Sequence, residues 1–94
     1  MNTNADLSLK EYVARIEEAC GGERDFIIHF KFEKKDEAIG KILKKTKVEK
    51  TIAGIIFDLT YKGLSIRLYN TGKAIIKRAV DKDQAQSVLA ELLL

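Results

Sequence analysis

The segment 26–33 alternates strictly between apolar and polar residues, and this pattern constrains the fold more than any other feature of the sequence. The even positions hold large apolar side chains: Phe26, Ile28, Phe30 and Phe32. The odd positions hold Ile27, His29, Lys31 and Glu33. A period of two is typical of a β-strand with one face against a core. We therefore expect a strand over 26–33 with its four even-numbered residues buried.

Three more strands are predicted in the second half of the chain, at 51–61, 64–70 and 73–80. Lys62-Gly63 separates the first two, and Asn70-Thr71-Gly72 separates the last two. These connections are too short for anything but hairpins. The four predicted strands should therefore form an antiparallel sheet.

Three helices are also predicted, each from apolar residues that repeat every three or four positions. The first begins at Ser8, with Glu11 completing a capping box, and ends at Gly21-Gly22. The second begins at Asp36 and the third at Asp81. The expected apolar stripes are Leu9, Tyr12, Val13, Ile16, Ala19 and Cys20 in the first helix, Ala38, Ile39, Ile42 and Leu43 in the second, and Ala85, Val88, Leu89 and Leu92 in the third.

These elements predict one α+β domain over residues 1–94, in which 1–22 form the N-terminal helix and 26–94 form the remaining unit. The expected order is α-β-α-β-β-β-α. The expected architecture is a curved four-stranded antiparallel sheet with the helices packed mainly on one face. A chain of 94 residues is of single-domain size and gains stability from oligomerisation.

Composition favours a cytoplasmic protein with no place in a membrane. The apolar runs are far shorter than the roughly 20 residues that span a bilayer, and the first residues lack the features of a signal peptide. A single cysteine, Cys20, gives no internal disulfide and suits a reducing compartment. The net charge is +3, with five lysines in 41–50 and five basic residues without an acid in 62–78. Such basic segments attract phosphates, although they also suit a solvated surface.

No pattern in the sequence indicates an enzyme, a metal site or a cofactor. His29 is the only histidine, and a zinc site needs about three or four ligands. Cys20 lies on an apolar stripe after two glutamates, where its thiol should be inert. Gly72-Lys73 lies between two strands, whereas a phosphate-binding loop joins a strand to a helix. We expect a non-enzymatic binding module.

The outward face of the predicted sheet is the best candidate for a binding surface. By alternation it holds isoleucines together with basic and aromatic side chains, which supply apolar contact area and partners for phosphate or carboxylate. The candidate residues are Ile52, Arg67, Tyr69, Lys73, Ile75 and Lys77. The alternative is that the first helix covers this face.

From Phe26 onward the order of elements resembles a single repeat of the TATA-binding protein. The similarity is best over residues 66–76, which read Ile-Arg-Leu-Tyr-Asn-Thr-Gly-Lys-Ala-Ile-Ile. The family binds the DNA minor groove on a concave sheet and kinks the duplex with apolar wedges. The resemblance implies that the wedge positions fall on Ile52 and Tyr69 and that Lys73 lies near the phosphate backbone. It also implies that Ile75 and Lys77 lie on the sheet face.

Two functions follow as expectations. The first is nucleic-acid binding through the sheet face of a homodimer, which would rebuild the two-repeat saddle of the family. The second is a protein-interaction or dimerisation subunit, such as the small subunit of a tRNA-modifying complex like KEOPS. Asp58, which lies on the expected DNA-facing surface, departs from the family pattern.

Overall fold

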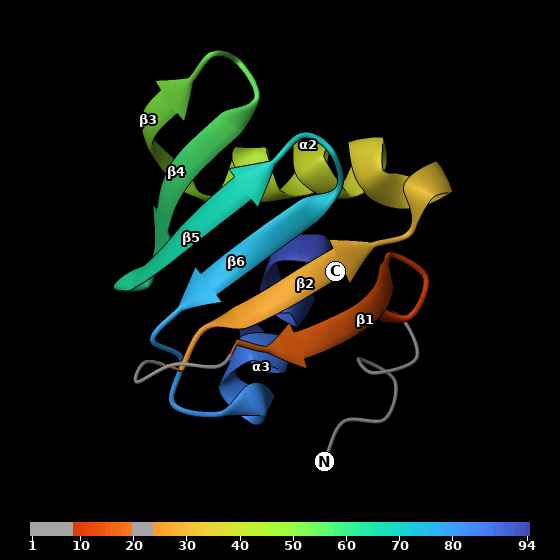
Figure 1. The fold of residues 1–94 in the computed structure, drawn as a ribbon, viewed down its shortest axis with the longest axis vertical. Helices are drawn as coiled ribbons and strands as arrows, with labels where there is room; N and C mark the ends of the chain where they lie inside the picture. The colour runs from red at the N-terminus through yellow and green to blue at the C-terminus, as the bar shows by residue number, and fades with distance from the viewer. Residues whose placement is uncertain (1–8, 20–23) are drawn as a thin grey trace.

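The computed structural model describes residues 9–19 and 24–94, and they form a six-stranded antiparallel sheet with two α-helices (Figure 1). In chain order the elements are β1 (Val13–Glu18), β2 (Phe26–Phe30), the 3-10 helix η1 (Phe32–Lys34), α2 (Lys35–Lys45), β3 (Lys47–Ile52), β4 (Ile56–Tyr61), β5 (Leu64–Tyr69), β6 (Lys73–Lys77) and α3 (Lys82–Leu93). Across the sheet the strands run in the order β1-β2-β6-β5-β4-β3. The chain is thus α+β with an antiparallel sheet, as the sequence predicts.

The core lies between one face of the sheet and the two helices, which lie behind the sheet in Figure 1. In the central strands every second residue is buried, and the burial of Phe26, Ile28 and Phe30 confirms the predicted inner face of β2. The helices bury the predicted stripes, with Leu43 only partly covered. The alternate residues of the strands and the residues that repeat every three or four positions in the helices therefore pack against each other in one apolar layer.

The sheet has six strands and not the predicted four, and one of the two additional strands arises because the segment 51–61 is part of a hairpin and not one strand. The main chain reverses at Ala53 and Gly54, whose φ values are 55° and 68°. The N–H of Ile55 donates to the carbonyl of Ile52 across this turn. Two consecutive residues with positive φ give the type I′ turn that matches the twist of a hairpin. Its first arm, β3, is largely exposed at the sheet edge, so its sequence lacks apolar alternation.

The predicted N-terminal helix is also wrong where the structure describes it. After a turn at residues 9–12 the chain forms β1, which pairs antiparallel with β2. This strand gives the outward-pointing backbone groups of β2 hydrogen-bond partners, which a helix cannot do. Leu9, Tyr12 and Val13 are still buried, so the apolar stripe was correctly located but misread in period. Ser8, Cys20 and Gly21-Gly22 lie outside the described residues.

Phe32 contradicts the predicted length of the strand that begins at Phe26. The strand ends at Phe30, and η1 turns the chain toward α2. Phe32 is 81% exposed, with the ammonium of Lys35 5.5 Å from its ring centre. The strand ends where the chain leaves the sheet, although the alternation in the sequence continues. The side chain of Phe32 therefore does not reach the core.

The remaining boundaries agree closely with the sequence. Gly63 and Gly72 have positive φ in the two predicted turns. Asp81 accepts a hydrogen bond from the N–H of Gln84 at 2.8 Å and so caps α3 as predicted. Asp36, by contrast, lies in the first turn of α2 and is not its cap.

Candidate nucleic-acid interface

One face of the sheet has no layer of described residues over it. Both helices pack on the opposite face, and β1 lies within the sheet at its edge (Figure 1). The segment that was expected to be the first helix therefore does not cover this surface between residues 9 and 19. We call this surface the open face.

The strand register places the side chains of the open face in three rows, because directly paired residues in antiparallel strands project to the same side. The first row reads Ile52, Ile56, Tyr69, Lys73, His29 and Arg15. The second row reads Lys50, Asp58, Arg67, Ile75, Ile27 and Glu17. The third row reads Lys47, Thr60, Ser65 and Lys77. All six predicted site residues therefore share this face.

Tyr69 and Lys73 are direct neighbours on β5 and β6. The Lys73 ammonium lies 4.7 Å from the centre of the Tyr69 ring, within the range of a cation–π contact. Both side chains are half-buried, and Ile56 flanks the tyrosine on its other side. Lys73 makes no ion pair with a carboxylate in the described part of the chain. The pair thus places a positive charge that has no described carboxylate partner over one face of an aromatic ring.

Arg67 is held by Asp58 on the neighbouring strand. Its Nε and Nη2 donate to the two carboxylate oxygens at 2.8 and 3.3 Å. This hydrogen bonding holds the pKa of Asp58 below its usual value, and the charges of Arg67, Lys77 and Lys50 lower it further. The same contact raises the pKa of Arg67. The negative charge of Asp58 is therefore balanced by Arg67 on the open face, and the guanidinium of Arg67 is partly occupied by this ion pair.

The net charge of the open face is positive. Its rows contain six basic side chains, Arg15, Lys47, Lys50, Arg67, Lys73 and Lys77, against Glu17 and Asp58. Glu49 adds a third acid at the β3 edge, where it accepts a hydrogen bond from Thr60. At the other edge His29 Nε2 lies 2.5 Å from Glu17 Oε1. Positive charge is therefore concentrated over β3 to β6.

Sequence reasoning missed the contributions of the two edge strands. Arg15 and Glu17 were assigned to a helix, and Lys47 and Lys50 were placed before any strand. Thr51 and Ile52 already belonged to the strand expected at 51–61, so the signal missed in β3 is the β-branched Val48.

No group of three histidine, cysteine, aspartate or glutamate side chains suited to a metal ion is present among residues 9–19 and 24–94. Within the same ranges no helix has the length and apolar character needed to cross a membrane. Comparison with protein-family models, curated proteins and solved structures found no match for this chain.

Proposed function

We propose that this chain is a non-enzymatic nucleic-acid-binding module that uses the open face of its sheet. The observation that supports the proposal best is the set of Tyr69, Lys73 and Lys77 on the open face, in which Lys73 pairs with Tyr69 and Lys77 lies four residues farther along β6, opposite Ser65. It combines an aromatic ring with two ammonium groups that have no carboxylate partner in the described part of the chain. A ring that stacks on a base, next to cations that contact phosphates, is the usual arrangement of a single-strand binding surface.

The surrounding residues favour contact with a polyanion. Lys50 and Lys77 lie close enough to Asp58 to lower its pKa, so they flank the neutralised Arg67–Asp58 pair. A strand of nucleic acid lying across β6, β5, β4 and β3 meets Lys77 on one side of the pair and Lys50 on the other. We further propose that the unit 26–94 is related to the TATA-binding-protein repeat. That resemblance places Ile52 and Tyr69 at the wedge positions and Lys73 near the phosphate backbone, and it places Ile75 and Lys77 on the sheet face.

A protein-binding role is the second candidate, and the apolar centre of the open face favours it. Ile75 and Ile27 are direct cross-strand neighbours in the second row and are only half-buried. Apolar residues at the centre of a surface with charges around them are typical of protein interfaces. A partner chain would cover these isoleucines, whereas a nucleic acid would mainly use the lysines and Tyr69.

Fluorescence anisotropy with a labelled oligonucleotide of about 20 nucleotides, single-stranded or duplex, tests the first proposal at about 50 mM salt. Tyr69→Ala should weaken binding about tenfold, since stacking on one aromatic contributes roughly 1–3 kcal/mol. Phe32→Ala is the matched control, because that ring is exposed outside the open face. Replacing Lys73 and Lys77 with alanine should reduce the slope of log affinity against log salt by about 1.5 to 2.

Lysines on α2 offer the competing basic surface. Lys41 donates to Tyr12 and to the carbonyl of Leu93, and Lys45 donates to the carbonyl of Glu91, so Lys44 is the least engaged of the three. If replacing Lys44 and Lys45 abolished binding while Tyr69→Ala bound normally, the open face would not be the site. If no oligonucleotide bound at low salt, the protein-binding role would replace the nucleic-acid role.

A further inference from the structure

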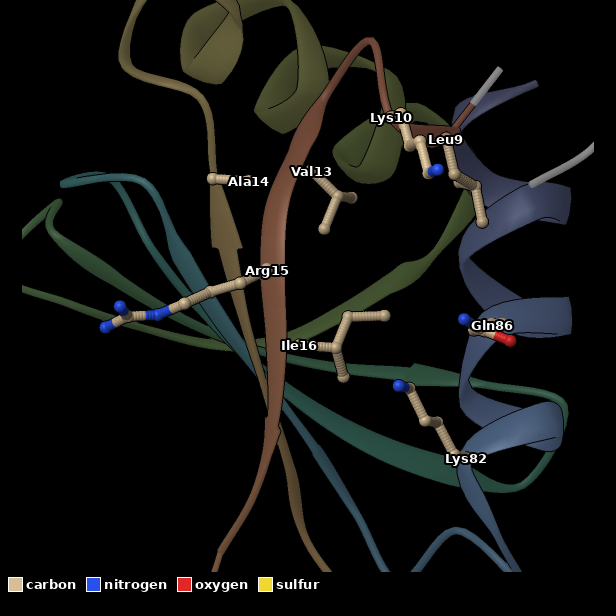
Figure 2. A pocket seen from close by; sticks show the side chains of 8 residues that line it. All are labelled: Leu9, Lys10, Val13, Ala14, Arg15, Ile16, Lys82 and Gln86. Atoms are coloured by element: carbon tan, nitrogen blue, oxygen red, sulfur yellow. The ribbon is translucent and has the colours of Figure 1, made fainter. Parts of the chain in front are cut away.

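A second candidate surface lies at the β1 edge of the sheet, between β1 and α3. Here the structure contains a groove of about 310 Å³ whose lining includes Leu9, Lys10, Val13, Ile16, Lys82 and Gln86. Figure 2 shows Val13 and Ile16 pointing from β1 toward α3, and Lys82 extending from α3 toward β1. The groove lies on the helix side of the sheet and is separate from the open face.

The backbone of β1 has a free hydrogen-bonding edge along this groove. The N–H of Ala19 donates to the carbonyl of Asp25, and the N–H of Lys31 donates to the carbonyl of Tyr12. These two hydrogen bonds lie at the two ends of the β1–β2 pairing. Counting back in twos from Ala19 places the N–H groups that face β2 on Glu17 and Arg15. Those of Ile16 and Glu18 then point away from β2, where no described strand pairs with them.

The charges around the groove select the chemistry of a partner. Lys10 and Lys82 have no ion-pair partner among the described residues, and no acidic side chain lines the groove. Arg15 points to the other side of β1 in Figure 2 and is paired with Glu17 at 3.4 Å. Two free cations beside the apolar side chains of Leu9, Val13 and Ile16 favour a ligand with both apolar and acidic residues.

We propose that the groove between β1 and α3 binds an extended acidic peptide of a partner protein, which pairs with the free edge of β1. Main-chain hydrogen bonds to Ile16 and Glu18 supply affinity, and alternate side chains of the peptide enter the groove. Apolar side chains contact Val13 and Ile16. Flanking carboxylates meet Lys10 and Lys82.

A peptide of sequence Glu-Thr-Val-Thr-Val-Thr-Glu with a fluorescent label tests this proposal on the full chain. It should bind, and replacing both of its glutamates with lysine should remove binding. Two N-methylated versions, one modified at the threonines and one at the other positions, separate strand pairing from charge attraction. One of the two should lose binding, because only one set of N–H groups faces β1.

Variants of the protein locate the site. Lys82→Glu should weaken peptide binding about fivefold or more by reversing a charge at the groove. Lys82 is the first residue of α3, where an acidic side chain suits the helix, so the fold should be retained. Lys44→Glu makes the same charge change on the exposed side of α2 and should bind like the unmodified chain.

Amide signals from NMR complete the test. Peptide binding should shift the Ile16 and Glu18 amides and slow their hydrogen exchange. Absence of binding, equal binding by both N-methylated peptides, or equal effects of Lys82→Glu and Lys44→Glu would overturn the proposal. It would also be overturned if two copies of the chain paired through these amides, since the occupant would then be a second copy.

Discussion

Asp58 and Arg67 show how a single residue pair adapts an acidic side chain to a basic surface. The sequence alone placed Asp58 as an unfavourable charge on the expected DNA-facing surface. Its bidentate contact with Arg67 removes that conflict, because the carboxylate is hydrogen-bonded and its charge is balanced. The cost is that Arg67 is less available to a ligand than Lys73 or Lys77.

The lowered pKa of Asp58 predicts a specific pH dependence of stability. A carboxyl whose folded pKa lies below its unfolded value of about 4 stabilises the fold above that value. This contribution is lost as the pH falls through the folded pKa. Carboxyl NMR titration should show the low pKa of Asp58, and Arg67→Met should raise it, with Lys50 and Lys77 keeping part of the shift.

The stability of the Arg67→Met variant should therefore depend on pH. It should be less stable than the unmodified chain near neutral pH, and the two should converge below the folded pKa of Asp58. Urea unfolding at several pH values measures this difference. A difference that stayed constant down to the lowest pH would contradict the assignment.

Phe30 and Phe32 provide a second prediction at the level of the residue. Phe30 is buried and Phe32 is 81% exposed, although alternation assigned both to the core. Phe30→Ala should lower the free energy of unfolding by about 3–5 kcal/mol, as expected for a core truncation. Phe32→Ala is the matched control and should change it by no more than about 0.5 kcal/mol. Equal effects in urea unfolding would mean that β2 extends beyond Phe30.

At the level of the element, the β3–β4 hairpin depends on a turn whose chemistry is not optimal. The type I′ conformation favours asparagine followed by glycine, whereas this chain has Ala53 and Gly54. Alanine at a φ of 55° is strained. The hairpin is therefore held by cross-strand pairing with β4 and less by its turn.

Changes at the turn should act on stability in opposite directions. Ala53→Asn should raise the free energy of unfolding by about 0.5–1 kcal/mol, because asparagine adopts positive φ more readily. Gly54→Ala should lower it by about 1 kcal/mol. A Cβ at Gly54 would meet no heavy atom within 4 Å, so this loss would arise from the backbone alone. Thermal unfolding of both variants checks the pair, and a stable Gly54→Ala variant would contradict the assigned turn.

At the level of the whole molecule, the sheet ends in β3, most of which is exposed. Five of its six residues are exposed, including Val48 at 43%. An antiparallel pairing of two copies centred on Val48 places Lys47 of one copy opposite Glu49 of the other. Opposite charges in direct cross-strand pairs are favourable. Such a homodimer continues the open face across two copies and leaves the β1 groove accessible.

We therefore expect the chain to sediment as a dimer at micromolar concentration. Glu49→Lys should shift it toward the monomer, because lysines would then face each other across the pair. The additional change Lys47→Glu should restore the dimer by exchanging the two charges. A monomer at all concentrations, or a dimer that ignores both changes, would exclude this interface.

The sequence by itself determined those features that depend on neighbours along the chain. The inner face of β2, the stripes of α2 and α3, the turns at Gly63 and Gly72 and the Asp81 cap all follow from local periodicity and backbone preference. Five of the six candidate residues of the open face were also found this way, because alternation along a strand decides which side a residue faces. The sixth, Ile52, lies on β3, and its side of the sheet is set by its pairing with Ile56.

The tertiary structure decided what depends on partners distant in the sequence. Residues 13–18 form a strand because the edge of β2 needs hydrogen-bond partners, although their apolar spacing also suits a helix. β3 exists as an exposed edge because β4 supplies its backbone partners, so apolar alternation could not reveal it. The Arg67–Asp58 pair and the β1–α3 groove likewise require the register and the packing of the sheet. These features could not be predicted from the sequence because they depend on hydrogen bonds between segments that are distant along the chain, and such bonds leave no local pattern.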